Sequence, residues 1–233
     1  MISVYPASSR YSADHGWLQS HFSFSFADYY DSDNMNFGPL RVLNDDIIAA
    51  GKGFGMHPHR EMEIVSVVLR GQLQHQDSLG HTAVTTYGQI QRMSAGKGVM
   101  HSEFNPSENE DMNLLQMWFM PNQEGVQPSY ETTTYDLAKT VNILLPIVSH
   151  QSSAEVAHIH QDMTMYMSRL EQGKEISFNQ AQNRRIFVFV TEGEITINGS
   201  TQLHNRDSAR ITETTALNIS SVQGGSFILI DLP

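Results

Sequence analysis

Two short motifs limit what this chain can fold into: His-Pro-His at residues 57–59 and His-Ser-Glu at residues 101–103. Each motif holds two metal-binding side-chain types at positions i and i+2. In a β-strand such a pair points to one face, because the side-chain period is two. Two such strands facing each other would direct three imidazoles and one carboxylate at a common point, a donor set that suits a first-row transition metal with open coordination positions. The four donors are His57, His59, His101 and Glu103.

The composition is that of a globular chain, and it excludes several kinds of partner and site. The 233 residues are 39% hydrophobic and 17% charged, which is typical of a folded protein with one or two domains. A formal net charge of −11 without a Lys/Arg cluster argues against direct nucleic-acid binding and against an anionic membrane surface. The chain has no cysteine, so only histidine and carboxylate side chains could hold a metal.

The sequence predicts a cytoplasmic protein that does not enter a membrane. Residues 1–6 lack the basic and apolar regions of a signal peptide. Apolar runs such as residues 65–69 are far too short to span a bilayer. The absence of cysteine also fits a reducing compartment.

The pattern along the chain is mostly β. Residues 22–26 alternate phenylalanine with serine, the period-two signature of a strand with one apolar face. Residues 64–69 form a β-branched run that ends before Gly71, and further short apolar runs are separated by turns that contain glycine. Strands of this length with such turns indicate a sandwich or barrel. Only residues 135–140 are expected to form a short helix.

The second half of the chain repeats this pattern in diverged form. Residues 186–199 resemble residues 65–80 in shape, with an apolar strand, a glycine, an alternating strand and a glycine turn. A turn-rich stretch at residues 122–128 separates the halves. We therefore predict two β-barrel domains, residues 1–128 and residues 129–233. Because two barrels can cover each other's apolar faces within one chain, we expect a monomer.

Four stretches of the chain resemble the pirin family of cupin proteins. They are residues 21–30 (HFSFSFADYY), 57–63 (HPHREME), 74–80 (QHQDSLG) and 94–103 (SAGKGVMHSE). A glycine, five further residues and then His-x-His also match the first metal motif of cupin barrels. The resemblance is dense in the N-terminal half and looser in the C-terminal half.

This resemblance implies a fold and a metal site. Pirins are bicupins, all-β proteins with two barrels packed face to face and few short helices, and the N-terminal barrel carries the metal. The family's four ligands fall on His57, His59, His101 and Glu103, the residues that strand parity also selects. Iron(II) is the expected metal, because it fits a site with two open positions and can engage dioxygen; manganese, cobalt, nickel, copper and zinc are alternatives.

The resemblance also implies an activity. Bacterial pirins resemble quercetin 2,3-dioxygenases, which open the central ring of flavonols such as quercetin with dioxygen and release carbon monoxide. Glu103 would act as general base and accept the proton of the flavonol 3-hydroxyl. The same ligands would also serve a pirin-like redox switch that binds a transcription-related protein partner, and a metalloenzyme of another class is a third interpretation. An open, apolar-walled cavity would favour the enzyme, whereas a site closed by side chains would favour the switch.

Several further residues have simpler interpretations. Glu63 lies one position before the usual cupin glutamate ligand, so it is expected to be structural or to support the ligands. His75 is expected to hydrogen-bond the turn at Asp77. The motif at residues 158–160 repeats the His-x-His spacing without a glycine-rich run before it, so an ordinary strand with exposed histidines is expected. The candidates for the wall of a substrate pocket are Phe54 and Met56.

Overall fold

The structure, a computed structural model, describes residues 1–233 and confirms the all-β prediction. The chain forms two compact units. The first, which we call the N-barrel, consists of residues 11–135 and 151–161. The second, the C-barrel, consists of residues 1–10, 136–150 and 162–233.

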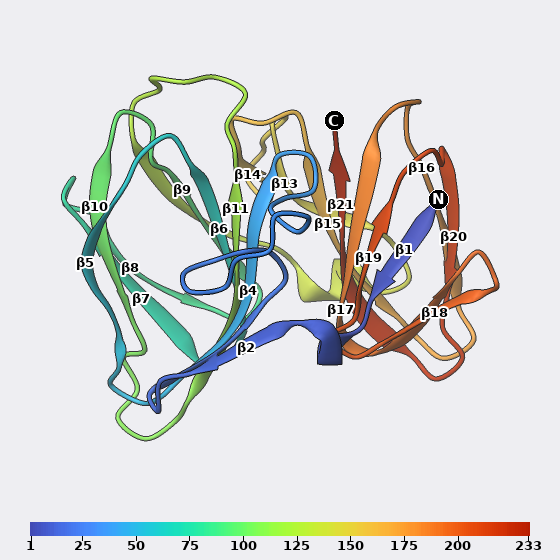
Figure 1. Ribbon diagram of the computed structural model, residues 1–233, viewed down its shortest axis with the longest axis horizontal. Coiled ribbons are helices and arrows are strands. Elements are labelled where there is room, and N and C mark those ends of the chain that lie inside the picture. The colour runs from blue at the N-terminus through green and yellow to red at the C-terminus, as the bar shows by residue number, and fades with distance from the viewer. The chain divides into compact units, whose positions relative to one another are not determined.

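The N-barrel contains two antiparallel sheets, which lie on opposite sides of the barrel in Figure 1. The four-stranded sheet has the order β5 (Gly53–His59), β10 (Val99–Phe104), β7 (Gln72–Asp77) and β8 (Thr82–Thr86). The seven-stranded sheet has the order β12 (Ser129–Thr134), β9 (Gln89–Ser94), β6 (Glu63–Arg70), β11 (Met112–Phe119), β4 (Leu40–Ile48), β3 (Leu18–Phe22) and β2 (Tyr11–Asp14). The two-residue strand β14 (Ala157–His158) also belongs to this unit.

A row of polar side chains crosses the interior of the N-barrel. Ser66 on β6 is paired with Gln91 on β9 and with Gln116 on β11, and Gln116 is paired in turn with Asn44 on β4. Asn44, Ser66 and Gln91 are at most 4% exposed. Buried polar groups cost free energy unless they find hydrogen-bond partners. The row therefore marks a level where the barrel interior is not simply an apolar core.

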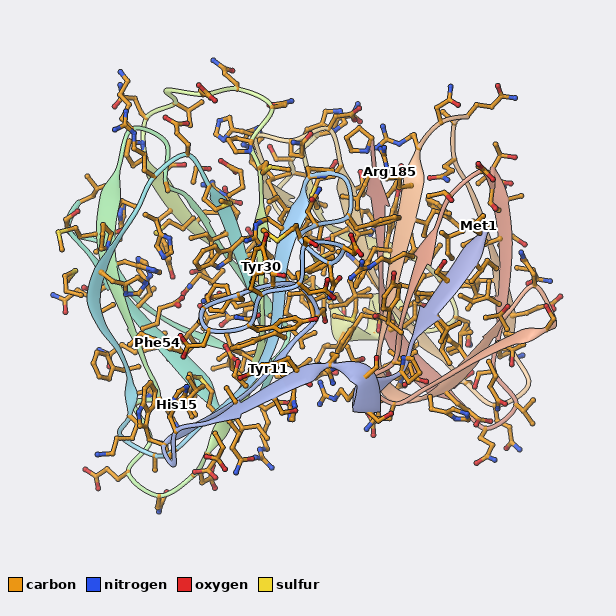
Figure 2. The ribbon with its side chains drawn as sticks, in the orientation of Figure 1. Met1, Tyr11, His15, Tyr30, Phe54 and Arg185 are labelled. Carbon is orange, nitrogen blue, oxygen red and sulfur yellow. The ribbon has the colours of Figure 1, made fainter.

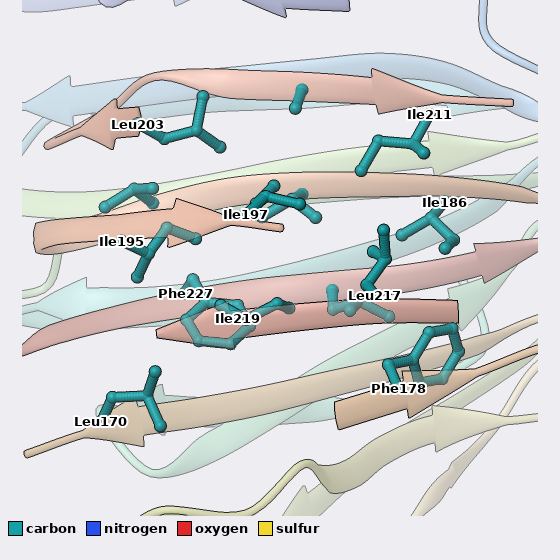
Figure 3. Close-up of a cluster of buried hydrophobic side chains, with 14 residues drawn as sticks. Leu170, Phe178, Ile186, Ile195, Ile197, Leu203, Ile211, Leu217, Ile219 and Phe227 are labelled. Carbon is teal, nitrogen blue, oxygen red and sulfur yellow. The ribbon is translucent and has the colours of Figure 1, made fainter. Parts of the chain in front are cut away.

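The C-barrel has an apolar interior. One layer has the order β1 (Ile2–Tyr5), β19 (Ser208–Ile211), β17 (Arg185–Ile197), β21 (Gly225–Leu232), β15 (Thr164–Leu170) and β13 (Leu145–Ser149). The long strand β17 continues into a second layer with β18 (Thr201–His204), β20 (Ala216–Ser220) and β16 (Glu175–Asn179). Figure 3 shows the 14 buried apolar side chains between these strands, among them Ile186, Ile197 and Phe227. The interior of this barrel is thus filled by core packing.

The two barrels repeat one turn that the sequence pattern indicated. Gly71 lies between β6 and β7 with φ +80°, and Gly193 lies at a bend within β17 with φ +71°. Only glycine adopts positive φ without steric cost. In the N-barrel this bend separates two strands, whereas in the C-barrel β17 continues through it with a register shift after Val190.

The helices are two single 3-10 turns, Ala7–Ser9 and Leu137–Thr140. The second lies in the stretch where a short helix was predicted, and the Asp136 carboxylate caps it by accepting from the Ala138 backbone N–H at 2.9 Å. None of the helices has the length and apolar character needed to cross a membrane.

The unit boundaries differ from the predicted division after residue 128. Strand β12 begins at Ser129 but pairs with β9, so it completes the N-barrel. Residues 1–10 belong to the C-barrel, where β1 pairs with β19, and residues 151–161 return to the N-barrel. Composition reveals a turn-rich stretch, but strand pairing between distant segments decides to which unit a strand belongs.

Candidate metal centre

Strands β5 and β10 bring three histidines together. His57 and His101 lie directly opposite each other in the antiparallel register, and His59 shares a strand face with His57. The ring centroids are separated by 4.5 Å for His57 and His101, 4.9 Å for His57 and His59, and 4.8 Å for His59 and His101. One ligand nitrogen from each ring lies within 4.8 Å of the others. This spacing allows the three imidazoles to share one metal ion.

Close approach of the two strands depends on Gly53. A Cβ atom at this position would lie 2.2 Å from the Glu103 carbonyl oxygen, far inside van der Waals contact. The register also shifts between His101 and Glu103. Glu103 therefore lies opposite Phe54, whereas an unbroken ladder would place it opposite Gly55. A shift of this kind re-aims side chains beside a site.

Hydrogen bonds leave imidazole lone pairs free to face the centre of the cluster. His57 Nδ1 lies 2.7 Å from the Gly55 carbonyl oxygen, to which it donates, so His57 Nε2 is unprotonated in the neutral ring. That Nε2 lies 3.0 Å from His59 Nε2. His101 Nε2 is buried and has no hydrogen-bond partner. A buried nitrogen without a partner is costly, and coordination to a metal would satisfy it.

The electrostatic setting keeps His59 and His101 neutral. Burial, reinforced by the neighbouring histidines, lowers the pKa of His59 to about 4 and that of His101 to about 3. Both rings are therefore unprotonated at neutral pH. Metal binding requires the neutral imidazole, so these side chains are ready to coordinate without first losing a proton.

A second row of side chains supports His101 from behind. His75, which is fully buried, lies with its Nδ1 atom 3.4 Å from His101 Nδ1. His75 Nε2 lies 3.2 Å from Asp77 Oδ2, which also contacts His81. Burial alone would raise the pKa of Asp77, but hydrogen bonds from His75, His81 and the backbone N–H of Leu79 lower it overall. The predicted contact between His75 and the turn at Asp77 is thus confirmed.

Glu103 is buried on the same strand as His101, at 2% exposure. Its two carboxylate oxygens accept hydrogen bonds from Gln91 Nε2 and Gln116 Nε2, both at 2.6 Å. One of its oxygens lies within 4.8 Å of a ring nitrogen of His75 and of His101. It does not form such a group with His57, His59 and His101 together. The structure therefore places Glu103 beside the cluster, held by the polar row of the barrel interior, and its membership of the ligand set stays a prediction.

An aromatic-walled cavity of about 460 Å³ opens beside the cluster. His57 and Glu103 both line it. Phe54 and His15, labelled in Figure 2, lie on its wall as well. Pockets of this size are typical of small-molecule sites. The aromatic walls are formed by Trp17, Phe22, Phe26, Phe54 and Trp118.

Trp118 connects this wall to the cluster. Its ring lies 4.7 Å from the His59 ring in an edge-on arrangement, and its Nε1 donates to Gln116 Oε1 at 3.1 Å. Phe54 lines the cavity as predicted. Met56, the other predicted wall residue, is 49% exposed and is not part of the lining. Met56 is the neighbour of His57 on β5 and points to the other face, whereas the register shift between His57 and Phe54 breaks the alternation, so Phe54 and His57 both reach the cavity.

The remaining candidates have structural partners. Glu63 is 1% exposed and its Oε2 accepts from Ser94 Oγ at 2.9 Å and from the His160 backbone N–H at 3.1 Å. His160 Nδ1 lies 3.4 Å from Glu63 Oε1. The expectation of exposed histidines at residues 158–160 is therefore wrong: both rings are partly buried, and His160 is bound to Glu63. Burial and hydrogen bonding give Glu63 the structural role expected of it.

Several residues at the site were not singled out from the sequence. They carried one signal, which is a polar side chain in the middle of an apolar strand. Gln116 interrupts the run of β11, and Asn44, Asp45 and Asp46 interrupt the run of β4. In a barrel strand such positions face either solvent or a polar interior. Without the register of neighbouring strands the sequence does not decide between them.

The comparisons with known proteins agree with this architecture. Residues 5–119 match the family model described as Pirin, and residues 146–232 match the model described as Quercetinase C-terminal cupin domain. The chain is 41% identical over 233 residues to an Escherichia coli K12 protein named quercetin 2,3-dioxygenase, covering 100% of this chain and 99% of that relative. It is 35% identical over 232 residues to a pirin-like protein of Caulobacter vibrioides, covering 99% of each.

Solved structures show the same two-domain fold. The crystal structure of YhhW from Escherichia coli matches with a TM-score of 0.96 and 40% identity, over 100% of this chain and 98% of that chain. A structure of bacterial pirin YhhW in complex with nickel(II) matches with a TM-score of 0.95 and 40% identity, over 100% of this chain and 99% of that chain. The predicted bicupin class is confirmed, and the chain belongs to the pirin family.

Proposed function

We propose that this protein is a metal-dependent dioxygenase that opens the central ring of flavonols such as quercetin. The observation that carries the proposal is the aromatic-walled cavity of about 460 Å³ whose lining includes both His57 and Glu103. A flat aromatic substrate needs such walls beside the reacting groups. The relatives named quercetin 2,3-dioxygenase support the same assignment.

The donor set fits a divalent metal ion. His57, His59 and His101 would hold it through neutral imidazoles, with Glu103 as the fourth ligand, and the buried Nε2 of His101 would gain the partner that it lacks. A bound transition metal would supply Lewis acidity and a route for dioxygen to react with an electron-rich substrate. Iron(II) is our first choice, with manganese, cobalt, nickel, copper and zinc as alternatives; a relative's structure contains nickel(II).

Glu103 is the proposed general base. It is the carboxylate on the cavity wall nearest in sequence to the histidine ligands, and it would accept the proton of the flavonol 3-hydroxyl. Gln91 and Gln116 fix both of its oxygens, so its orientation is set before the substrate arrives. The aromatic walls would exclude water and hold the flavonol plane against the cluster.

The cavity also favours the oxygenase role over the redox-switch role. A redox switch that binds a protein partner needs no room for a small molecule beside its metal, whereas an oxygenase does. The wall residues leave that room on the side of His57. We therefore place the oxygenase first. A monomeric state and a cytoplasmic location stay predictions from the sequence.

The test is turnover with a matched pair of histidine variants. The full chain is purified without oxygen, its metal is measured, and loss of quercetin absorbance is followed in air for wild type, His59→Ala and His158→Ala. Wild type and His158→Ala should consume quercetin and dioxygen and release carbon monoxide, and His59→Ala should not. Full metal loading with no turnover under iron, manganese, cobalt, nickel or copper would refute the oxygenase assignment.

A further inference from the structure

Polar side chains line the cavity from both sheets of the N-barrel. Ser20 on β3 and Asn44 and Asp46 on β4 line the cavity from the seven-stranded sheet, whereas His57 and Glu103 line it from the four-stranded sheet. Asn44 and Asp46 are two residues apart and therefore share a strand face, and Ser20 is paired with Asp46 in the register. All three are at most 4% exposed.

Asp46 keeps its proton to a much higher pH than an ordinary carboxyl group. Ser20 Oγ donates to its Oδ1. Burial, with smaller contributions from the charges of Asp45 and Glu103, raises the pKa of Asp46 to about 7. No lysine or arginine lines the cavity, so a charged carboxylate here has no permanently charged counter-ion. The neutral form offers one O–H group to a ligand.

Asn44 supplies the complementary acceptor. Its Oδ1 is buried and has no hydrogen-bond partner in the protein. An orphan acceptor of this kind costs about 1–3 kcal/mol, and a ligand that reaches it with a donor would relieve that cost. A donor and an acceptor on adjacent positions of one strand face match a hydroxyl group, which both donates and accepts.

We infer that Asn44 and Asp46 form a hydroxyl-recognition subsite that selects aromatic ligands carrying additional hydroxyl groups remote from the one that faces the histidine cluster. The inference rests on the proposed function for the ligand class, and it narrows that class from flavonols to flavonols that carry further hydroxyl groups. The aromatic walls would hold the rings of the ligand. Asn44 and Asp46 would bind the hydroxyl groups at one end of it, and the histidine cluster and Glu103 would face the other end.

Tryptophan fluorescence reports on this cavity alone. The chain has two tryptophans, Trp17 and Trp118, and both line the cavity. Flavonols that bind there should quench this emission, so affinity is measurable without turnover. The full chain is loaded with zinc, which undergoes no redox change, and is titrated without oxygen with quercetin and with 3-hydroxyflavone, which retains only the 3-hydroxyl.

The subsite predicts tighter binding of quercetin by about tenfold, since each hydrogen bond contributes roughly 0.5–1.5 kcal/mol. A merely apolar cavity predicts the opposite order, because 3-hydroxyflavone is the less polar ligand. In Asp46→Leu and in Asn44→Leu the preference should fall to about threefold or less. Asp46→Asn, which keeps a donor and an acceptor, should retain it.

Asp45→Asn is the matched control, because Asp45 lies on the opposite face of β4 and accepts from Asn113 at 2.8 Å. It should keep the wild-type preference. Wild-type preference for 3-hydroxyflavone, or a quercetin preference unchanged in both leucine variants, would overturn the subsite. A quercetin preference in the zinc-loaded protein, with no turnover in air after loading with iron, manganese, cobalt, nickel or copper, would refute the oxygenase proposal and leave the subsite supported. Turnover with one of those metals, but no quercetin preference in the zinc-loaded protein, would refute the subsite and leave the oxygenase proposal supported.

Discussion

His75 lies directly behind His101, with their Nδ1 atoms 3.4 Å apart. Asp77 accepts from His75 Nε2 at 3.2 Å, so the neutral His75 ring presents an unprotonated Nδ1 to His101. The proton of His101 then lies on Nδ1, and its Nε2 lone pair is free. A carboxylate behind a histidine thus fixes the tautomer of the next histidine, as is common for metal ligands.

Replacing His75 should weaken metal binding. His75→Phe keeps the stacking on Tyr130, whose ring lies 4.2 Å away, but removes the hydrogen bond to His101. We expect zinc affinity, measured by competition with a chelator, to fall about 10- to 100-fold. His81→Ala is the control, since His81 contacts Asp77 without contacting His101. Equal zinc affinities in wild type and His75→Phe would show that the contact does not orient the ligand.

Glu103→Gln should separate metal binding from chemistry. Glutamine preserves the shape but cannot accept the substrate proton, so quercetin consumption should fall at least about 100-fold. The histidines should still hold the metal with reduced affinity. The prediction is checked by metal analysis and steady-state turnover on the same sample, and a variant that keeps both metal and turnover would exclude Glu103 as base.

Glu63→Ala should affect stability and not metal content. The substitution leaves Ser94 and the His160 backbone N–H without their buried acceptor, which should lower the free energy of unfolding by about 1–3 kcal/mol. Urea denaturation measures this loss. Metal per chain should equal that of wild type, and a variant that loses its metal while folded would place Glu63 among the ligands.

Gly53→Ala and Gly55→Ala form a matched pair on one strand. A Cβ at Gly53 would meet the Glu103 carbonyl oxygen at 2.2 Å, whereas a Cβ at Gly55 would meet nothing within 4 Å. The first should part β5 from β10, lower stability by about 1–3 kcal/mol and weaken zinc binding. The second should change neither quantity measurably. Thermal unfolding with and without zinc distinguishes the two variants.

Asp46 should make its own contribution to the pH dependence of stability. In the unfolded chain its pKa is near 3.8, and in the folded chain burial raises it to about 7. Between these pH values the folded chain binds the extra proton, so this carboxyl lowers stability as the pH rises. Asp46→Asn removes the effect.

The stability of Asp46→Asn relative to wild type should therefore increase from pH 4 to pH 7, by a few kcal/mol at most. The comparison cancels the opposite contribution of His59 and His101, whose lowered pKa values make the fold gain stability over an overlapping range. Urea unfolding of both proteins at several pH values measures the difference. A difference that is flat with pH would mean that Asp46 ionises normally in the fold.

The class of fold and the pairing of candidate ligands within each motif follow from the residue pattern alone. The i, i+2 spacing in His57-Pro58-His59 requires only local backbone geometry, since any extended strand aligns such a pair. The spacing in His101-Ser102-Glu103 predicts a second such pair, and the antiparallel pairing of β5 with β10 brings His101 opposite His57. The alternation of apolar residues likewise predicted barrels, because a strand with one apolar face must cover a core.

What surrounds these histidines depends on the packing of the whole barrel. The register shift before Glu103, the amides of Gln91 and Gln116 that hold it, and the approach of His75 to His101 all arise between strands far apart in the sequence. The assignment of β12 to the N-barrel and the burial of Asp46 have the same origin. Strand order and register are properties of the whole barrel. A single stretch of residues therefore fixes which of its side chains share a face, but not which side chains of other strands they contact.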